Sequence, residues 1–224
     1  MALDRRNMLL LGGGVAVAVA VAGVAMWPGG DTGDQAGKPA VNPKMAKLLV
    51  PGPLGEQELG SKDAAVTVIE YASMTCPHCA RFHSDVYPDL KRKYIDTGKI
   101  RFIFREFPLD QRAHAAFMLT RCAEENKFFP FIDILFQKQS QWAPPDDWDA
   151  QLLKLSQFAG FSKDSFIKCL QNVDIAKGVM AVKTKAETEF EVNSTPSFFI
   201  NDKLFRGNLS FQEMEKIIDP LLAG

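Results

Sequence analysis

Val66-Thr-Val-Ile-Glu-Tyr-Ala-Ser-Met-Thr-Cys-Pro-His-Cys79 is the stretch that decides how this chain folds. Its first half is a β-branched, apolar run typical of a buried strand, and its second half opens an amphipathic helical pattern. Two cysteines separated by two residues, placed after a strand and at the start of a helix, indicate a redox site. A helix N-terminus has unpaired N–H groups and partial positive charge, so it stabilises a thiolate at Cys76.

The residues between the two cysteines suit this position. Pro77 fits the first turn of a helix, where its missing N–H costs no hydrogen bond. His78, when protonated, adds a second positive charge beside the sulfur. The alternative for such a pair is half of a zinc site, but zinc requires four ligands, usually from a second pair. The remaining cysteines, Cys122 and Cys169, stand alone and far apart, which argues against a metal.

The first 28 residues predict a signal peptide or an N-terminal membrane anchor. Arg5 and Arg6 precede an almost uninterrupted apolar stretch from Met8 to Trp27, which suits a secretory signal and is also long enough to span a bilayer. Positive charge before this stretch keeps the N-terminal end cytoplasmic and places the rest of the chain outside. Both outcomes put Cys76 in a compartment where disulfides persist.

Residues 29–53 are rich in proline, glycine and polar side chains without a helical or strand period, which predicts a flexible linker. The remaining residues suffice for a domain with a hydrophobic core. The net charge of −1 and the absence of long basic runs argue against binding of nucleic acid.

Beyond the linker, the patterns predict an alternating α/β start, a helical middle and a β-β-α end. A helix is expected from Cys76 to about Thr97, and a strand over Ile100–Phe107 that ends before Pro108. Together with the first strand they form a parallel βαβ unit with a right-handed crossover. The later patterns predict helices over residues 111–125, 129–139, 148–159, 163–171 and 175–190, a hairpin over 197–201 and 204–207, and a helix over 211–222.

A βαβ unit with Cys-x-x-Cys at the start of its helix, followed much later by a proline-initiated β-β-α unit, resembles the thioredoxin fold. With a large helical block between the two halves, and Pro-His between the cysteines, the chain resembles the DsbA family of secreted thiol:disulfide oxidoreductases. The resemblance is carried by Gly60-Ser61, Val66–Tyr71, Cys76–Cys79, Ser194–Asn201 and Gly207 with the helix after it. It implies an α/β, thioredoxin-like domain over residues 54–108 and 190–224, with an inserted helical domain over residues 109–189.

The resemblance also implies the roles of the site residues. Cys76 is expected to form the mixed disulfide with substrate and Cys79 to resolve it, with no cofactor other than their own disulfide. Stabilising the Cys76 thiolate makes that disulfide a stronger oxidant. In this family a cis proline packs opposite the cysteines. It corresponds to Pro196, which leaves the Thr195 backbone free to pair with an extended substrate peptide.

Glu70 has two interpretations. It matches an acidic residue of the DsbA pattern, which implies proton transfer to Cys79. Alternatively, it is a strand-edge carboxylate paired with a basic residue such as Arg105.

Other conspicuous residues are open to simpler interpretations. His83 and His114 lie on helical patterns and are interpreted as ordinary surface or core histidines. A substrate surface beside Cys76 is expected to include Met74, Thr75, Trp142 and Trp148.

Cys122 and Cys169 both lie on the apolar faces of helical patterns. Either they are buried free thiols that pack as small hydrophobes, or they form a structural disulfide in an oxidising compartment, as in one branch of the DsbA family.

We therefore expect a thiol:disulfide oxidoreductase of the periplasm, or cell envelope, that donates its Cys76–Cys79 disulfide to reduced exported proteins. Because one disulfide serves one turnover, the resemblance implies a membrane reoxidase of the DsbB kind as a partner. One alternative is a dedicated thiol reductase or isomerase. The other is a non-catalytic metal-binding or peptide-binding module on the thioredoxin scaffold.

Overall fold

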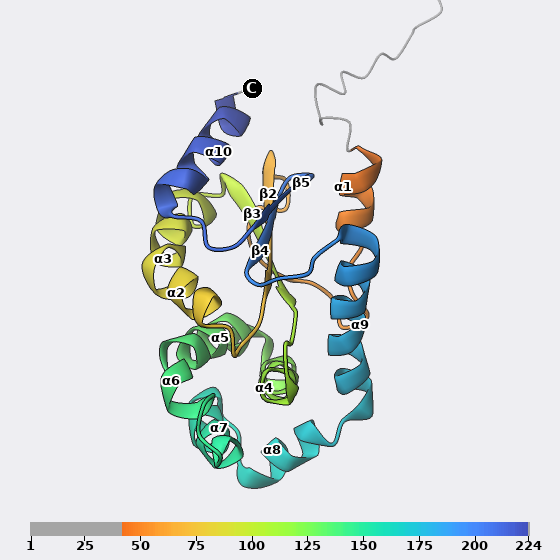
Figure 1. Ribbon diagram of the computed structural model, residues 1–224, viewed down its shortest axis with the longest axis vertical. Coiled ribbons are helices and arrows are strands. Elements are labelled where there is room, and N and C mark those ends of the chain that lie inside the picture. Colours follow the sequence, from red (N-terminus) through yellow and green to blue (C-terminus); the bar gives the residue numbers. More distant parts are fainter. Residues whose placement is uncertain (1–41, 224) are drawn as a thin grey trace, which may run out of the picture. The chain divides into compact units, whose positions relative to one another are not determined.

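A five-stranded mixed sheet lies between two layers of helices (Figure 1). The computed structural model describes residues 42–223, so the predicted signal or anchor, residues 1–28, and the first part of the predicted linker lie outside the described residues. The strand order is β1-β3-β2-β4-β5, and β2 and β3 are parallel while the other pairs are antiparallel. The strands are β1 Gln57–Gly60, β2 Val66–Ala72, β3 Ile100–Glu106, β4 Ser197–Ile200 and β5 Lys203–Arg206. This arrangement confirms the predicted α/β, thioredoxin-like fold.

Strand β2 is buried along its whole length because helices cover both faces of the sheet. On one face, Val66 and Val68 pack with side chains of α2 and α10. On the other face, Ile69 and Tyr71 pack with side chains of α1 and α9. Figure 1 shows these two layers on opposite sides of the sheet. Alternation along β2 therefore assigns Glu70 to the face of α2 and Tyr71 to the face of α1.

The predicted helix from Cys76 to Thr97 is wrong in one respect, because three shorter segments replace it. They are α2 Pro77–Asp85, α3 Tyr87–Leu90 and the π-helical turn Lys91–Ile95. Val86, between the first two, departs from helical geometry with φ −121°. Pro88 accounts for the interruption, since it has no N–H to donate to the preceding turn.

The predicted flexible linker, residues 29–53, extends too far. A helix, α1 Pro43–Leu48, lies inside this range and begins with an Asn42 side-chain cap. Met45 and Leu48, three residues apart on one face of α1, are buried in the apolar cluster that covers the sheet. Burial of these two side chains makes residues 42–48 part of the fold. No sequence pattern predicted β1, a short strand at the edge of the sheet next to β3.

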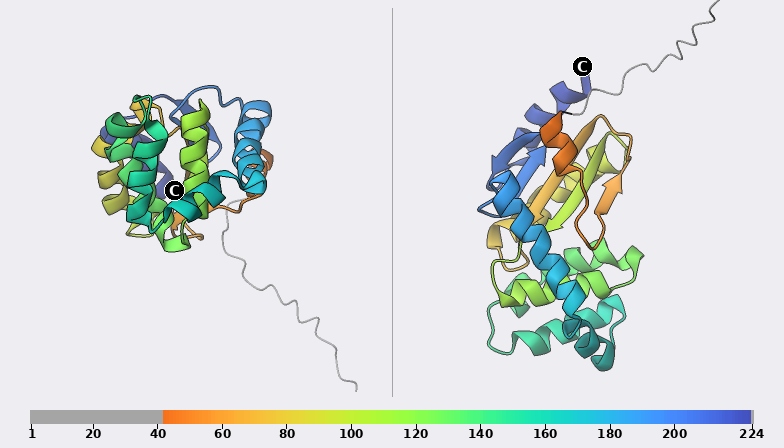
Figure 2. Two further views of the ribbon diagram at one scale, coloured as in Figure 1. Left: turned by 90° about the horizontal axis from the view of Figure 1, so that it is seen from below. Right: turned by 90° about the vertical axis from the view of Figure 1, so that its right-hand side faces the viewer.

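The helices after β3 form a layer beyond one end of the sheet (Figure 2). They are α4 Gln111–Cys122, α5 Phe128–Gln137, α6 Gln139–Trp142, α7 Trp148–Ser156 and α8 Lys163–Leu170, and they are followed by α9 Val173–Phe190 and, after the hairpin, α10 Phe211–Ala223. Helix α9 begins against α4 and continues along the sheet. One apolar cluster extends from β2 and α2 to α4, α5, α7 and α8, so the sheet and the helical layer share a core. Within residues 42–223, no helix combines the length and the apolar character that a bilayer crossing requires.

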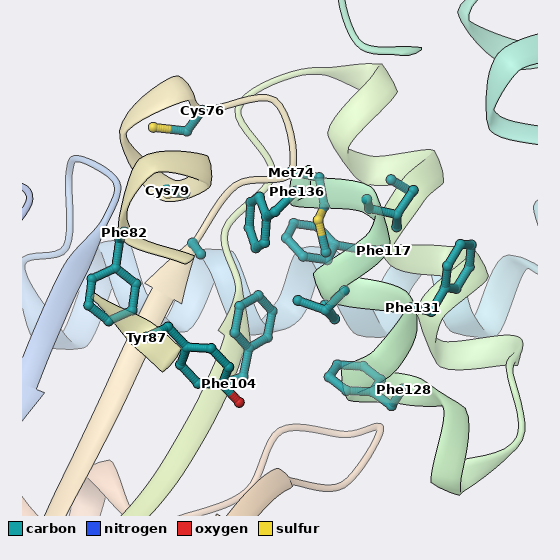
Figure 3. Packing of buried hydrophobic residues seen from close by; sticks show 14 of the residues in the cluster. Met74, Cys76, Cys79, Phe82, Tyr87, Phe104, Phe117, Phe128, Phe131 and Phe136 are labelled. Carbon is teal, nitrogen blue, oxygen red and sulfur yellow. The ribbon is translucent and has the colours of Figure 1, made fainter. Parts of the chain in front are cut away.

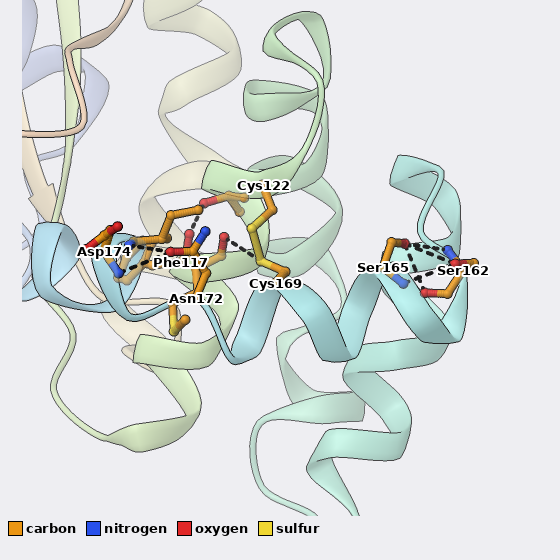
Figure 4. Close-up of a disulfide and its surroundings, with 10 residues drawn as sticks. Phe117, Cys122, Ser162, Ser165, Cys169, Asn172 and Asp174 are labelled. Carbon is orange, nitrogen blue, oxygen red and sulfur yellow. Dashed lines mark hydrogen bonds between the residues drawn. A yellow bond between two sulfur atoms is a disulfide. The ribbon is translucent and has the colours of Figure 1, made fainter.

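Cys122 and Cys169 form a disulfide, which decides between the two interpretations of these residues. The bond joins the last residue of α4 to α8, with a Cα–Cα distance of 6.1 Å (Figure 4). The cysteines are separated by 47 positions in the chain. Closing a loop of that length stabilises the fold by about 4 kcal/mol in the chain-entropy model.

Candidate active site

Cys76 and Cys79 stand at the start of α2, at the junction of the sheet and the helical layer (Figure 3). Cys76 is the N-cap residue and α2 begins at Pro77, as the sequence predicts. Both cysteines are free thiols in the structure. Cys76 is 5% exposed, whereas Cys79, one turn into the helix, is completely buried. Only the sulfur of the first cysteine is therefore accessible from outside without a rearrangement of the helix.

The peptide bond between Thr195 and Pro196 is cis, and Thr195 contacts the reactive cysteine. The Sγ of Cys76 donates a hydrogen bond to the Thr195 carbonyl oxygen at 3.3 Å. The hydroxyl of Thr195 is buried and has no hydrogen-bond partner. The loop before β4 and the start of α2 thus meet at one sulfur atom.

The loop before Cys76 is held by a residue that the sequence analysis did not single out. Gln139, the first residue of α6, donates hydrogen bonds from its Nε2 to the carbonyl oxygens of Met74 at 2.9 Å and Cys76 at 3.0 Å. Glutamine at a helix start has no distinctive sequence signal. Its role follows from the position of α6 above the active-site loop.

The pKa values of the two thiols are shifted in opposite directions. The pKa of Cys76 is lowered to about 5. The hydrogen bond from the Cys79 thiol is the largest cause, burial opposes it, and the Thr195 side chain and the N–H groups of Cys79 and His78 contribute the rest of the lowering. Burial raises the pKa of Cys79 well above its ordinary value, and the neighbouring Cys76 and Glu70 raise it further. At neutral pH the site therefore holds a thiolate at Cys76 and a thiol at Cys79.

Glu70 is buried and faces α2, where its Oε2 lies 3.0 Å from Nε2 of His83. The alternative pairing with Arg105 is wrong. Arg105 is aligned with Tyr71 in the sheet, so its side chain lies on the face opposite Glu70. There it donates hydrogen bonds to Glu56 and to the Tyr71 hydroxyl.

His83 is a buried core residue, as one of the two simpler interpretations predicts, but it is also the partner of Glu70. Cys79, Phe82 and His83 are the buried residues of α2 and fall at i, i+3 and i+4. This spacing was the available signal that His83 faces the same interior as Cys79. His114 lies on α4 and is not part of this pair. Its Nε2 is 3.0 Å from the carbonyl oxygen of Ala176 on α9.

A cavity of about 730 Å³ opens beside Cys76, between the active-site loop and the helical layer. Thr75, Pro77 and Trp148 line it together with residues of α4 and α6. Met74 and Trp142 are completely buried, so their prediction as surface residues is wrong. Trp142 instead donates a hydrogen bond from its indole nitrogen to the Leu135 carbonyl within the core.

Cys122 and Cys169, bonded to each other, are not available to complete a zinc site with the active-site pair. Over residues 42–223, no group of three or more histidine, cysteine, aspartate or glutamate side chains is arranged to hold a metal ion.

Comparison with known proteins agrees with the geometry of the site. The family model described as thioredoxin matches residues 54–220. The chain belongs to the thioredoxin family. Within it, the chain is a DsbA-like member: the crystal structure of Wolbachia pipientis alpha-DsbA1 superimposes with a TM-score of 0.72 and 34% sequence identity, covering 79% of this chain and 95% of that one.

Curated relatives in this thioredoxin family are named for disulfide chemistry. A "Putative protein-disulfide oxidoreductase" of Rickettsia bellii is 38% identical over 144 residues, which are 64% of this chain and 56% of the relative. Disulfide bond formation protein D of Bacillus subtilis is 27% identical over 180 residues, 76% of this chain and 78% of the relative. The chain spans 56% to 67% of the length of five Rickettsia relatives.

Proposed function

We propose that this protein is a thiol:disulfide oxidoreductase that donates its Cys76–Cys79 disulfide to reduced exported proteins. The observation that carries the proposal is the contrast between a Cys76 pKa of about 5 and a raised Cys79 pKa. A stabilised thiolate favours the reduced enzyme, so the oxidised enzyme readily gives up its disulfide.

The size of this effect supports a donor rather than an acceptor. At pH 7, ionisation of a thiol of pKa about 5 favours the reduced enzyme about 100-fold, whereas an ordinary cysteine, which is hardly ionised at this pH, gives almost no such gain. A factor of 100 in the exchange equilibrium corresponds to about 60 mV for a two-electron couple. The Cys76–Cys79 disulfide is therefore more oxidising by about this amount than it would be with an unperturbed thiol.

The surroundings of Cys76 suit a polypeptide substrate. An extended client segment pairs with the Thr195 backbone on one side of the sulfur, and main-chain hydrogen bonds accept many sequences. The cavity beside Thr75 and Pro77 leaves room for client side chains on the other side. Pro77 and His78 are exposed and border the reacting sulfur.

We place this activity in the cell envelope, with residues 1–28 acting as a signal peptide or a membrane anchor. Two observations support this location. In that segment Arg5 and Arg6 precede a long apolar stretch, and the Cys122–Cys169 disulfide is of a kind that persists outside the cytoplasm. A membrane reoxidase of the DsbB kind would restore the Cys76–Cys79 disulfide after each turnover.

The reduction potential of the Cys76–Cys79 pair tests the proposal. We expect a value well above that of thioredoxin, about −270 mV. A value near the thioredoxin potential would assign the protein to the reductases. A reduced model peptide with two cysteines should become oxidised by the parent and not by Cys76→Ala. A non-catalytic peptide-binding module would instead behave toward the peptide in the same way before and after this substitution.

A further inference from the structure

The buried Glu70–His83 pair has one unpartnered atom at each end. Both side chains are almost completely inaccessible, and Oε2 of Glu70 lies 3.0 Å from Nε2 of His83. Oε1 of Glu70 and Nδ1 of His83 have no hydrogen-bond partner. Because a buried polar atom without a partner costs stability, two of them on one pair indicate a function other than stabilising the fold.

The inner end of the pair is coupled to Cys79. The charge of Glu70 contributes to the raised pKa of Cys79, after burial and the neighbouring Cys76 sulfur. Cys79 is completely buried, so water does not reach its sulfur directly. Each redox cycle nevertheless requires Cys79 to lose a proton and to regain one.

The outer end of the pair leads toward solvent. Nδ1 of His83 lies 3.8 Å from Oδ1 of Asp133 on α5, and the Asp133 side chain is 39% exposed. His83 and Asp133 line a common cavity of about 150 Å³. This volume is large enough to admit water, and one water or a small rotation of Asp133 would span the gap between the two side chains. The His83 ring stacks on Phe136 at 4.3 Å, which fixes its orientation.

Proton transfer between Glu70 and Cys79 is what the resemblance to the DsbA family already implies. We propose that His83 and Asp133 continue this path as a proton relay from Glu70 to the cavity that both residues line. The proposal rests on the proposed function and names the residues that serve its resolving step. His83 does not touch the reacting sulfurs and acts through Glu70.

The transfer balances in both directions. During reoxidation Cys76 is held in a mixed disulfide with an external disulfide oxidant, and Cys79 passes its proton to Oε1 of Glu70. His83 then gives its Nδ1 proton to Asp133 and to water, which keeps the net charge of the Glu70–His83 pair unchanged. The Cys79 thiolate forms the bond to Cys76, and the oxidant's sulfur leaves as a thiolate with the bonding electron pair. When the enzyme disulfide oxidises a substrate, the protons return along the same path to Cys79.

The charges around His83 favour this arrangement. Burial opposes the imidazolium form, but Glu70 from β2 and Asp133 from α5 outweigh it and raise the pKa of His83 to about 9. The remaining titratable neighbours are Tyr87 of α3, whose pKa is raised by burial, and Lys91 at the cavity wall. At neutral pH His83 therefore holds the Nδ1 proton that the relay releases.

The resolving step can be isolated with oxidised glutathione. Reduced protein is mixed with an excess of glutathione disulfide and quenched with acid, and mass spectrometry follows conversion of the mixed disulfide into the Cys76–Cys79 disulfide. We expect His83→Gln to slow this first-order closure about 100-fold and Asp133→Asn about tenfold. Asp85→Asn, which changes an exposed carboxylate of α2, should leave the rate unchanged.

Added imidazole separates proton transfer from a structural role. In His83→Gln, closure should accelerate in proportion to imidazole concentration, while the parent should not respond. A slowed variant that ignores imidazole, or normal closure in both His83→Gln and Asp133→Asn, would overturn the relay. If His83→Gln folds poorly, Asp133→Asn still tests the relay, because the Asp133 side chain is partly exposed and its substitution does not disturb the core. A parent protein that forms no mixed disulfide at all would instead refute the proposed function.

Discussion

The sulfur of Cys76 donates a hydrogen bond to the carbonyl oxygen of Thr195, 119 positions later in the chain. This bond exists only while Cys76 is a thiol, because a thiolate has no proton to donate. The buried Thr195 hydroxyl has no hydrogen-bond partner beside the thiol form, and we expect it to donate to the ionised sulfur, since the Thr195 side chain lowers the pKa of Cys76. The same residue therefore accepts from the thiol form through its carbonyl and is expected to donate to the thiolate form through its hydroxyl.

Replacing Thr195 with valine should raise the pKa of Cys76 above its value of about 5. A hydrogen bond to a charged group contributes about 1.5 to 3 kcal/mol, which corresponds to a shift of about one to two pKa units. Titration of the ultraviolet thiolate absorbance measures this shift. Thr195→Ser retains the hydroxyl and should titrate like the parent; equal shifts in both variants would contradict the hydroxyl's role.

The reduction potential should change with pH in two regimes. Between about pH 5 and pH 9 reduction of the disulfide takes up one proton, at Cys79, because Cys76 remains a thiolate. The expected slope is about −30 mV per pH unit, and it should steepen to about −60 mV below pH 5, where Cys76 also binds a proton. Equilibration with glutathione buffers across this range gives the slope. A steep slope at pH 7 would show that Cys76 ionises like an ordinary thiol.

The Glu70–His83 pair should make stability depend on pH. The pKa of His83 rises from 6.5 to about 9 on folding, so its contribution is fully present below pH 6.5 and is lost as the pH rises through about 9. Integrated over that window, the loss is about 3 kcal/mol. Reduced Cys76, whose pKa is lowered on folding, would contribute a rise over the same window, so the oxidised protein is used, in which neither Cys76 nor Cys79 titrates. Urea unfolding of the oxidised parent at a series of pH values should show the decline. In His83→Gln the decline over this window should disappear, and its persistence would assign it to other groups.

Loss of the second disulfide should weaken the fold without changing the chemistry of the active site. A Cys122→Ala, Cys169→Ala double variant should be destabilised by up to about 4 kcal/mol, the loop-closure contribution of the bridge. Urea unfolding, with Cys76 alkylated in both proteins, measures the difference. The thiolate titration of Cys76 in the unalkylated variant serves as the control and should match the parent, because the bridge joins α4 and α8 rather than the start of α2.

Local signals predicted much of the fold and of the site. The placement of Cys76 at a helix start depends on residues within one turn. Strand β2 is visible as a mostly apolar, β-branched run, and β3 as a short run rich in isoleucine and phenylalanine. The helix after Cys79 is shorter than the predicted one because Pro88 interrupts it, and this proline is itself the local sequence signal for the break. The end of the linker was misplaced because α1 has only six residues, and two buried side chains give no periodicity.

By itself, the sequence determined where a thiolate is stabilised. Strand β2, the loop after it and the start of α2 at Pro77 are all encoded by residues that are adjacent in the chain. Only the tertiary structure decided which partners the buried groups have. Glu70 pairs with His83 because alternation along β2 and the buried face of α2 bring them to one layer, and Arg105 lies on the other face. Contacts such as that of Cys76 with Thr195 join segments more than 100 positions apart, so they depend on how the layers pack and not on any short-range pattern.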